Sequence, residues 1–487
     1  MQRIVASLLL LTVSASLCPA LVSTNVPLDH WSYEAVDKLA GYGLIDSAML
    51  TTKPISRIEM ARHIGQAMYR LRQEQDPPGV LLAIVDRLKR EFGGELILIG
   101  VLDGWYSDTS IKPVEDPYVK YLYSTNEPDI ENVRGDRFRE GSNYRAGFAS
   151  RATLFNEFAF SLHPEFIGSD EDGAGVDLIE GYGKAMVGPI EIEAGKDSLW
   201  WGPGHHGSIL MSNNAAPLTM VKVTNPRPIE LPWILKVLGP FRAQWFLTEL
   251  GDDRVLPKTQ LTGLRVNVRP YPWLEIGASR VIMYGGRGMP HVGVLDYGKM
   301  WVPGEEQARN NQIAGLDASF LVPLGKHPLL RSFKFYGDAA GEDAAHGWPA
   351  KWSYLLGLQL NDLLRTGRTD VRFEYADTHW VLYKHSVYTS GYTYEDRVIG
   401  HDVGPDARDV FVQLSHYLTG DFLVDISFDH QTFNRSAAVQ PTRRTVECGL
   451  TCFASPDWQV RAGYRYEDGD RGEDDDQIVQ IQLIREF

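Results

Sequence analysis

The stretch Val371-Arg372-Phe373-Glu374-Tyr375 carries an apolar side chain at every second position and a charged one between them. Successive side chains of a β-strand point to opposite faces, so the stretch predicts a strand with one apolar and one charged face. The same period of two is clear in residues 158–162, 190–194, 264–269, 422–428 and 460–466. So many strands with a charged second face predict a polar, wet interior, which a soluble sandwich would lack.

After the N-terminal segment the chain has no run of 18 or more apolar residues. The longest candidate, residues 96–102, is too short for a membrane-spanning helix. A chain that spans lipid without helices must close its strands into a barrel, because every backbone polar group has to be paired. At roughly 20 to 24 residues per strand and connection, residues 97–487 supply about 16 to 18 strands. The sequence therefore predicts a mainly β fold, a large antiparallel transmembrane barrel.

The first residues have the order of a signal peptide. Arg3 precedes an apolar core that runs from Ile4 to Leu17, and the small residue Ala20 follows shortly after it. Cleavage is expected after Ala20 or a few residues later.

The C-terminal residues alternate again, with Val479, Ile481, Leu483 and Phe487 on one face. This arrangement resembles the C-terminal signal that outer-membrane barrels present to their assembly machinery, so Phe487 is the expected contact with that machinery. Arg485 stands where an aromatic or aliphatic residue is usual. An arginine this close to the end can still reach the lipid head groups.

The composition contains 19 Phe and 22 Tyr, enough for aromatic girdles at both membrane surfaces. The expected girdle members are Tyr118, Tyr121, Tyr123, Tyr388, Tyr392 and Tyr394. The formal net charge of -15 speaks against nucleic acid as a partner, because nucleic-acid binding needs a basic face.

Before Leu96 the apolar spacing is helical. A first helix is expected to stop at the breaker Gly41-Tyr42-Gly43. Ser56 followed by Glu59 makes a capping box that begins a second helix. A third helix follows Pro77-Pro78 and is expected to end at a glycine pair, positions 93 and 94.

Parts of this helical region, residues 26–31, 43–45 and 55–61, resemble an S-layer-homology repeat. Such repeats can bind cell-wall polymers. Only one partial copy is present and the glycine-rich middle is missing, so a small periplasmic domain is favoured over a cell-wall anchor. The expected organisation is a signal peptide over residues 1–20, an N-terminal periplasmic helical domain over 25–96 and an outer-membrane β-barrel over 97–487.

One segment differs from the alternating background, residues 195–217, with Trp200-Trp201, Gly202-Pro203-Gly204-His205-His206-Gly207 and Asn213-Asn214. Paired tryptophans offer flat apolar faces with N–H donors, and paired asparagines offer donors and acceptors, which suits carbohydrate. The glycines and the proline instead favour a crowded loop that folds inward and constricts or braces the lumen. Both hypotheses concern the same candidates: Trp200, Trp201, His205, His206, Asn213 and Asn214.

The sequence predicts no catalytic residue, metal site or cofactor. His205 and His206 are adjacent, so on an extended chain they face opposite ways, and no acidic or cysteine ligand lies at useful spacing. The carboxylate pair Asp402/Asp406 could serve as a glycosidase acid and base, but nothing distinguishes it from other pairs. A non-enzymatic protein is therefore expected.

The region from Gly195 to about Pro228 closely resembles the signature stretch of the Wzi family of capsule-assembly outer-membrane proteins. That family likewise joins a signal peptide and an N-terminal helical region to a large barrel. The resemblance implies a lectin-like role, in which the protein binds capsular or other surface polysaccharide and attaches it to the cell. The charged inward faces leave one alternative open, a diffusion channel for sugars or anions.

Overall fold

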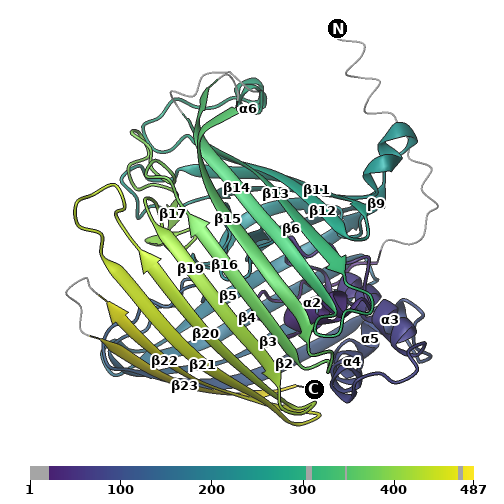
Figure 1. Ribbon diagram of the computed structural model, residues 1–487. Coiled ribbons are helices and arrows are strands. Elements are labelled where there is room, and N and C mark those ends of the chain that lie inside the picture. The colour runs from purple at the N-terminus through teal and green to yellow at the C-terminus, as the bar shows by residue number, and fades with distance from the viewer. Residues whose placement is uncertain (1–20, 303–309, 346–347, 470–474, 487) are drawn as a thin grey trace.

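The computed structural model describes residues 21–302, 310–345, 348–469 and 475–486. Its dominant element is a closed antiparallel barrel of 18 strands, in which neighbours along the chain pair with one another (Figure 1). The first strand, β2 (Ser110–Ser124), closes the barrel against the last, β23 (Asp476–Arg485). The predicted fold class is confirmed. The signal peptide expected over residues 1–20 and the terminal Phe487 lie outside the described residues.

Sixteen further strands complete the barrel. They are β3 (Gly141–Leu154), β4 (Phe158–Ser169), β5 (Gly173–Val187), β6 (Ile190–Asp197), β8 (Leu218–Thr224), β10 (Pro240–Glu249), β11 (Gln260–Tyr271), β12 (Leu274–Tyr284), β13 (Asn310–Pro323), β14 (Ser332–Ala345), β15 (Trp348–Leu363), β16 (Thr369–Asp377), β19 (Arg408–Tyr417), β20 (Phe422–Thr432), β21 (Thr442–Ser455) and β22 (Trp458–Gly469). Short elements in the connections are β1 (Thr52–Lys53), β7 (Trp200–Trp201), β9 (Ile229–Glu230), η1 (Trp233–Leu238), α6 (Val294–Met300), β17 (Thr393–Tyr394) and β18 (Arg397–Val398).

Apolar side chains face outward from the barrel and charged side chains face inward, as the period of two predicts. On β6, Ile190 and Ile192 are exposed on the outer surface, whereas Glu191 and Glu193 are buried inside. The inward carboxylates are paired, since Lys222 Nζ lies 2.8 Å from Glu193 Oε1. The outer surface is therefore the apolar band that membrane hydrocarbon covers.

Four helices precede the barrel: α2 (Ser32–Tyr42), α3 (Arg57–Leu71), α4 (Gly79–Glu91) and α5 (Gly93–Leu98). The predicted boundaries of the first two are confirmed. Gly43 ends α2 with φ 96°, and the backbone N–H of Glu59 donates to Ser56 Oγ at the start of α3. Gly93 begins α5 where the sequence predicted a helix end. In the described part of the chain, no helix combines the length and apolarity needed to cross a membrane.

The two ends of the barrel differ. At the short-turn end most connections are brief, among them residues 155–157, 188–189, 272–273 and 456–457, and the longest is 225–239; the long-loop end carries residues 125–140, 198–217, 250–259 and 378–407. The helices pack at the short-turn end, shown in purple in Figure 1. There Arg87 Nη2 donates to Gly420 O at 2.9 Å, and Ser332 Oγ donates to Gly41 O at 2.5 Å. The helical region thus covers one opening of the barrel.

The segment 378–407 also folds inward, and this corrects one prediction. Tyr388 and Tyr392 are fully buried and pack in the apolar cluster of the lumen, so they are not members of an aromatic girdle. Tyr123, on β2, is exposed on the barrel surface. The alternation that identifies strands could not show that a long connection turns back into the barrel.

Candidate functional site

The connection between β6 and β8, residues 198–217, folds into the lumen and is here called the inner loop. Its strand β7 pairs with β1 of the N-terminal region, with Thr52 opposite Trp201. The backbone N–H of Trp201 donates to Met211 O at 3.0 Å, and that of Gly202 donates to Thr51 O at 2.9 Å. The inner loop and the N-terminal segment therefore meet inside the barrel.

The two tryptophans of the inner loop are buried. Trp201 is 1% exposed, donates from Nε1 to Gln244 Oε1 at 2.6 Å, and packs edge-on against Phe246 with ring centroids 5.4 Å apart. Trp200 is 6% exposed and lies under Lys53 Nζ, 5.6 Å from the ring centroid. The ring of Trp201 is thus a packing element of the interior.

The backbone of the two histidines is held by one carboxylate of the barrel wall. Glu374 on β16 accepts the backbone N–H of His205 at 2.6 Å and that of His206 at 2.9 Å. His205 Nδ1 lies 3.3 Å from Glu34 Oε1 on α2, while the His206 ring stacks on Phe411 with centroids 4.0 Å apart. The two side chains point to different neighbours, as adjacent residues of an extended chain do.

His206 faces two buried carboxylates that the sequence did not connect with it. Its Nε2 lies 3.5 Å from Asp429 Oδ2 and 3.6 Å from Asp409 Oδ2. Burial would lower the pKa of His206, but these carboxylates outweigh it and raise the pKa well above the ordinary 6.5. Asp409 and Asp429 lie on β19 and β20, far from His206 in the chain, so spacing along the sequence could not reveal the cluster.

Two glycines of the inner loop lie too close to neighbouring atoms to carry a side chain. A Cβ on Gly204 would lie 2.0 Å from Gly207 O, and a Cβ on Gly207 would lie 2.4 Å from His401 Nε2. Real Cβ contacts are not this short, so a side chain at Gly204 requires movement of the loop backbone, and one at Gly207 requires movement of the loop or of the His401 ring. Crowding in the lumen therefore explains why glycine occupies these positions, and the composition of the motif had suggested such crowding.

The two asparagines tie the inner loop to other long connections. The backbone N–H of Arg134 donates to Asn213 O at 2.8 Å, and Asn213 Nδ2 donates to Asn132 O at 3.3 Å. Asn214 Nδ2 donates to Val398 O at 3.1 Å. Segments 125–140 and 378–407 are thereby joined through residues 213 and 214.

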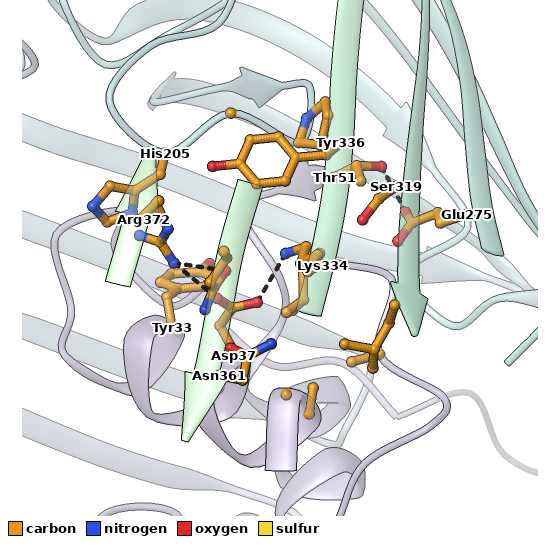
Figure 2. A pocket seen from close by; sticks show the side chains of 18 of the residues that line it. Tyr33, Asp37, Thr51, His205, Glu275, Ser319, Lys334, Tyr336, Asn361 and Arg372 are labelled. Atoms are coloured by element: carbon orange, nitrogen blue, oxygen red, sulfur yellow. Dashed lines mark hydrogen bonds and ion pairs between the residues drawn. The ribbon is translucent and has the colours of Figure 1, made fainter. Parts of the chain in front are cut away.

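A pocket of about 70 Å³ lies between α2, the inner loop and the barrel wall (Figure 2). In it Asp37 accepts from Lys334 Nζ and Arg372 Nη2, both at 2.9 Å. Burial would raise the pKa of Asp37, but these two cations outweigh it and lower the pKa from 3.8 to about 2. The volume suits on the order of a few water molecules. The pocket therefore serves as an electrostatic anchor of α2.

A second cavity, of about 360 Å³, lies beside the N-terminal part of α2 and is larger than the pocket around Asp37. Three of the six predicted site residues line it: Trp200, His205 and Asn213. Residues of the N-terminal region, Trp31 and Lys53 among them, complete its wall. Trp201 and His206 do not line it, so the structure divides the predicted set between different surroundings.

A cavity of about 630 Å³ opens among the loops of the long-loop end and is here called the outer basin. It is defined by Asp129, Glu131, Arg137, Asn214, Arg397, Asp402 and Arg443, with further polar neighbours. Its arginines are held in ion pairs. Arg397 Nη1 lies 2.8 Å from Asp129 Oδ1, and Arg443 Nη1 lies 3.3 Å from Asp129 Oδ2.

Glu131 of the outer basin is also held in an ion pair. Arg465 donates from its two terminal nitrogens to Glu131 at 2.8 and 2.7 Å. Burial would raise the pKa of Glu131, but Arg465 outweighs it and lowers the pKa. The outer basin is therefore a concave surface of fixed carboxylates, amides and guanidinium groups.

A model of the family described as "Capsule assembly protein Wzi" matches residues 119–478, most of the chain. The chain belongs to this family. The resemblance seen in the inner-loop motif is confirmed, and the Wzi-family chain is a multi-pass barrel of the bacterial outer membrane.

A solved structure from Escherichia coli is described as Wzi, an outer membrane protein involved in group 1 capsule assembly and a carbohydrate-binding β-barrel. It is 19% identical, has a TM-score of 0.73, and covers 94% of this chain and 99% of that one. An uncharacterized 55.8 kDa protein in the cps region of Klebsiella pneumoniae is 28% identical over 189 residues. That match spans 37% of this chain and 36% of the Klebsiella protein. OprD of Pseudomonas aeruginosa is 9% identical with a TM-score of 0.46, covering 78% of this chain and 96% of that one.

Of the six predicted residues, only Asn214 reaches the outer basin of this Wzi-family barrel. The basin arginines Arg137, Arg397 and Arg443 were missed. They lie in or beside long connections, and no local motif distinguishes them. The one available signal was the length of the segments 125–140 and 378–407, which marks the loops that carry function on a rigid scaffold.

Proposed function

We propose that this Wzi-family barrel binds a hydroxyl-rich surface polysaccharide in the outer basin, holds it at the cell surface and performs no catalytic step on it. The outer basin carries the proposal, because it is a polar cavity of about 630 Å³ among the long loops. Membership of the capsule assembly family and the fold shared with a carbohydrate-binding barrel support it.

The chemistry of the outer basin suits sugar hydroxyls. Carboxylate and amide oxygens of Asp129, Glu131 and Asn214 accept hydrogen bonds, and the guanidinium groups of Arg397 and Arg443 donate them. Ion pairs among these groups hold them in place before a ligand arrives, which reduces the ordering cost of binding.

The proposed orientation follows from the unequal ends of the barrel. Outer-membrane barrels have short periplasmic turns and longer extracellular loops. The outer basin therefore faces outward, and the helices at the short-turn end face the periplasm. The apolar belt between them, which includes Ile190 and Ile192, faces outer-membrane lipid.

For the inner loop we propose bracing of the lumen. Trp201 lies in an apolar cluster, and Tyr383 donates from its hydroxyl to Ile209 O at 2.5 Å, which joins the inner loop to segment 378–407. With β1 entering from the other side, folded chain crosses the lumen from both ends. This arrangement favours a closed barrel over the diffusion channel.

For the helical region we propose a periplasmic plug. Motif residues that resembled an S-layer-homology repeat are used in packing: Val26 is fully buried, and Trp31 packs edge-on against Phe453 of β21, with ring centroids 5.6 Å apart. A surface already packed on the barrel leaves less room for a cell-wall polymer. The proposed role of the helices is therefore to close the periplasmic opening of the barrel.

Affinity of the purified, full-length barrel for isolated capsular polysaccharide tests the proposed function. Arg443→Gln should weaken binding at least about tenfold, roughly 1.4 kcal/mol, because it removes a fixed donor of the outer basin. The matched control is Arg444→Gln, since Arg444 is the next residue of β21 and is largely exposed. Equal loss in both variants, or no binding by the wild-type chain, would contradict the proposal.

A further inference from the structure

The strongest feature outside the proposed glycan site is a group of imidazoles and carboxylates beneath it. His206 comes from the inner loop, His401 from segment 378–407, Asp409 from β19 and Asp429 from β20. Ligand atoms of His206, Asp409 and Asp429 lie within 4.8 Å of one another. His206, Asp409 and Asp429 therefore meet at one point, and His401 lies beside Asp409.

The polar atoms of this group lack ordinary partners. Within the described chain, His206 Nε2, both carboxylate oxygens of Asp409 and Asp429 Oδ1 are buried without a hydrogen-bond partner. His206 is 8% exposed and Asp409 is 2% exposed. Buried polar groups are normally hydrogen-bonded, and each exception requires an explanation. An ion among these atoms would supply it.

Charge balance also favours a cation. No lysine or arginine in the described residues lies within ion-pair distance of Asp409 or Asp429; their nearest partners are imidazole nitrogens. A divalent ion would neutralise both buried carboxylates and leave both imidazoles free to coordinate.

The spacing fits a small four-coordinate ion. His206 Nε2 lies 3.5 and 3.6 Å from the two carboxylates, and His401 Nε2 lies 3.8 Å from Asp409 Oδ2. Ligands at about 2.0–2.2 Å from a tetrahedral Zn²⁺ lie roughly 3.3–3.5 Å from one another. A small contraction of His206, Asp409 and Asp429 would reach that geometry, and a larger movement of the His401 ring would bring its Nε2 to the fourth position.

The surroundings orient the imidazoles as metal sites require. Asp402 Oδ1 lies 2.9 Å from His401 Nδ1, an ion-pair contact that lacks hydrogen-bond geometry, and His401 Nε2 lies 3.8 Å from Asp409 Oδ2. A carboxylate behind a histidine ligand is the usual supporting contact at zinc sites. The His206 ring is fixed by stacking on Phe411 with an interplanar angle of 7°.

We propose that His206, His401, Asp409 and Asp429 bind one Zn²⁺-type divalent ion, which pins the inner loop and segment 378–407 to the barrel wall. Imidazole and carboxylate together suit Zn²⁺ better than Ca²⁺, which takes six to eight oxygen ligands. A site closed by four protein ligands is structural. The sequence predicted no metal site at His206, because no acidic or cysteine ligand lies near it in the chain. The proposed carboxylate ligands of His206 instead lie on β19 and β20, which are distant in sequence.

Metal content of the full-length barrel tests the proposal. The purified chain is stripped with a chelator, loaded with Zn²⁺ or Ca²⁺, and measured by titration calorimetry and elemental analysis. We expect one Zn²⁺ per chain, at least about 100-fold weaker binding in His206→Gln and Asp409→Asn, and about 10- to 100-fold weaker binding in Asp402→Asn. Asp425→Asn is the matched control, since Asp425 lies on β20 four residues from Asp429 and contacts Ser415 instead.

Folding of every variant is checked by the heat-dependent migration of the barrel in electrophoresis. A variant that fails to fold is replaced by Asp402→Asn, which removes no direct ligand. Absence of stoichiometric Zn²⁺ in the wild-type chain, preference for Ca²⁺, or equal binding by all folded variants would overturn the proposal. None of these readouts involves polysaccharide, so they are independent of the proposed function.

Discussion

Replacing Trp201 tests whether the inner loop braces the lumen. The side chain is 1% exposed, packs on Phe246 and donates to Gln244. A buried tryptophan covers about 150–250 Å², so at 25 cal/mol per Å² its removal costs on the order of 4–6 kcal/mol. Truncation of buried aromatic residues typically costs about 3–5 kcal/mol, and Trp201→Ala is expected to fall in that range.

Trp201→Phe separates the two contributions. Phenylalanine keeps apolar packing but leaves Gln244 Oε1 without its donor, which costs about 1–3 kcal/mol. Trp105→Ala is the control, because Trp105 is largely exposed and such changes usually stay within about 0.5 kcal/mol.

The assay is reversible urea unfolding of the barrel in lipid vesicles, followed by tryptophan fluorescence. The expected order of destabilisation is Trp201→Ala, then Trp201→Phe, then Trp105→Ala. If Trp201→Ala lowers the free energy of unfolding no more than the control does, the inner loop is not a brace and the interior packing described here is wrong.

Three further outcomes are expected. In planar bilayers the wild-type barrel should show no steady open pore, because folded chain enters the lumen from both ends; a constant ohmic conductance would support the channel instead. Gly207→Ala should weaken the closure and produce intermittent openings, since its Cβ would lie 2.4 Å from His401 Nε2; wild-type behaviour would refute the crowding argument. Asp37, with its pKa lowered from 3.8 to about 2 by Lys334 and Arg372, contributes roughly 2 kcal/mol. That stability is present above pH 3.8 and lost as the pH falls through about 2. Asp37→Asn should remove this acid dependence, which unfolding titrations would measure.

Local pattern predicted most of the fold. Glu191 and Glu193 alternate with Ile190 and Ile192, and they lie inside and outside the barrel as that alternation requires. Ser56 caps α3 by accepting the backbone N–H of Glu59, which is only three residues further along the chain. Such features depend on neighbouring residues, so one sequence contains the necessary information.

The contents of the lumen could not be predicted in the same way. His206 meets Asp409 and Asp429 only after the barrel has closed, and Tyr388 is buried only because its connection turns inward. The arginines of the outer basin likewise come from different loops. These contacts depend on the relative positions of distant segments, which periodicity and motif spacing do not encode.

The outer basin is expected to hold polysaccharide at the cell surface. The most direct test deletes the gene, restores either the wild-type chain, Arg443→Gln or Arg444→Gln, and measures cell-bound against shed capsule. The wild-type chain and Arg444→Gln should restore retention, whereas Arg443→Gln should leave capsule in the medium at equal surface levels of the barrel. Unchanged retention after deletion, or full restoration by Arg443→Gln, would contradict the claim.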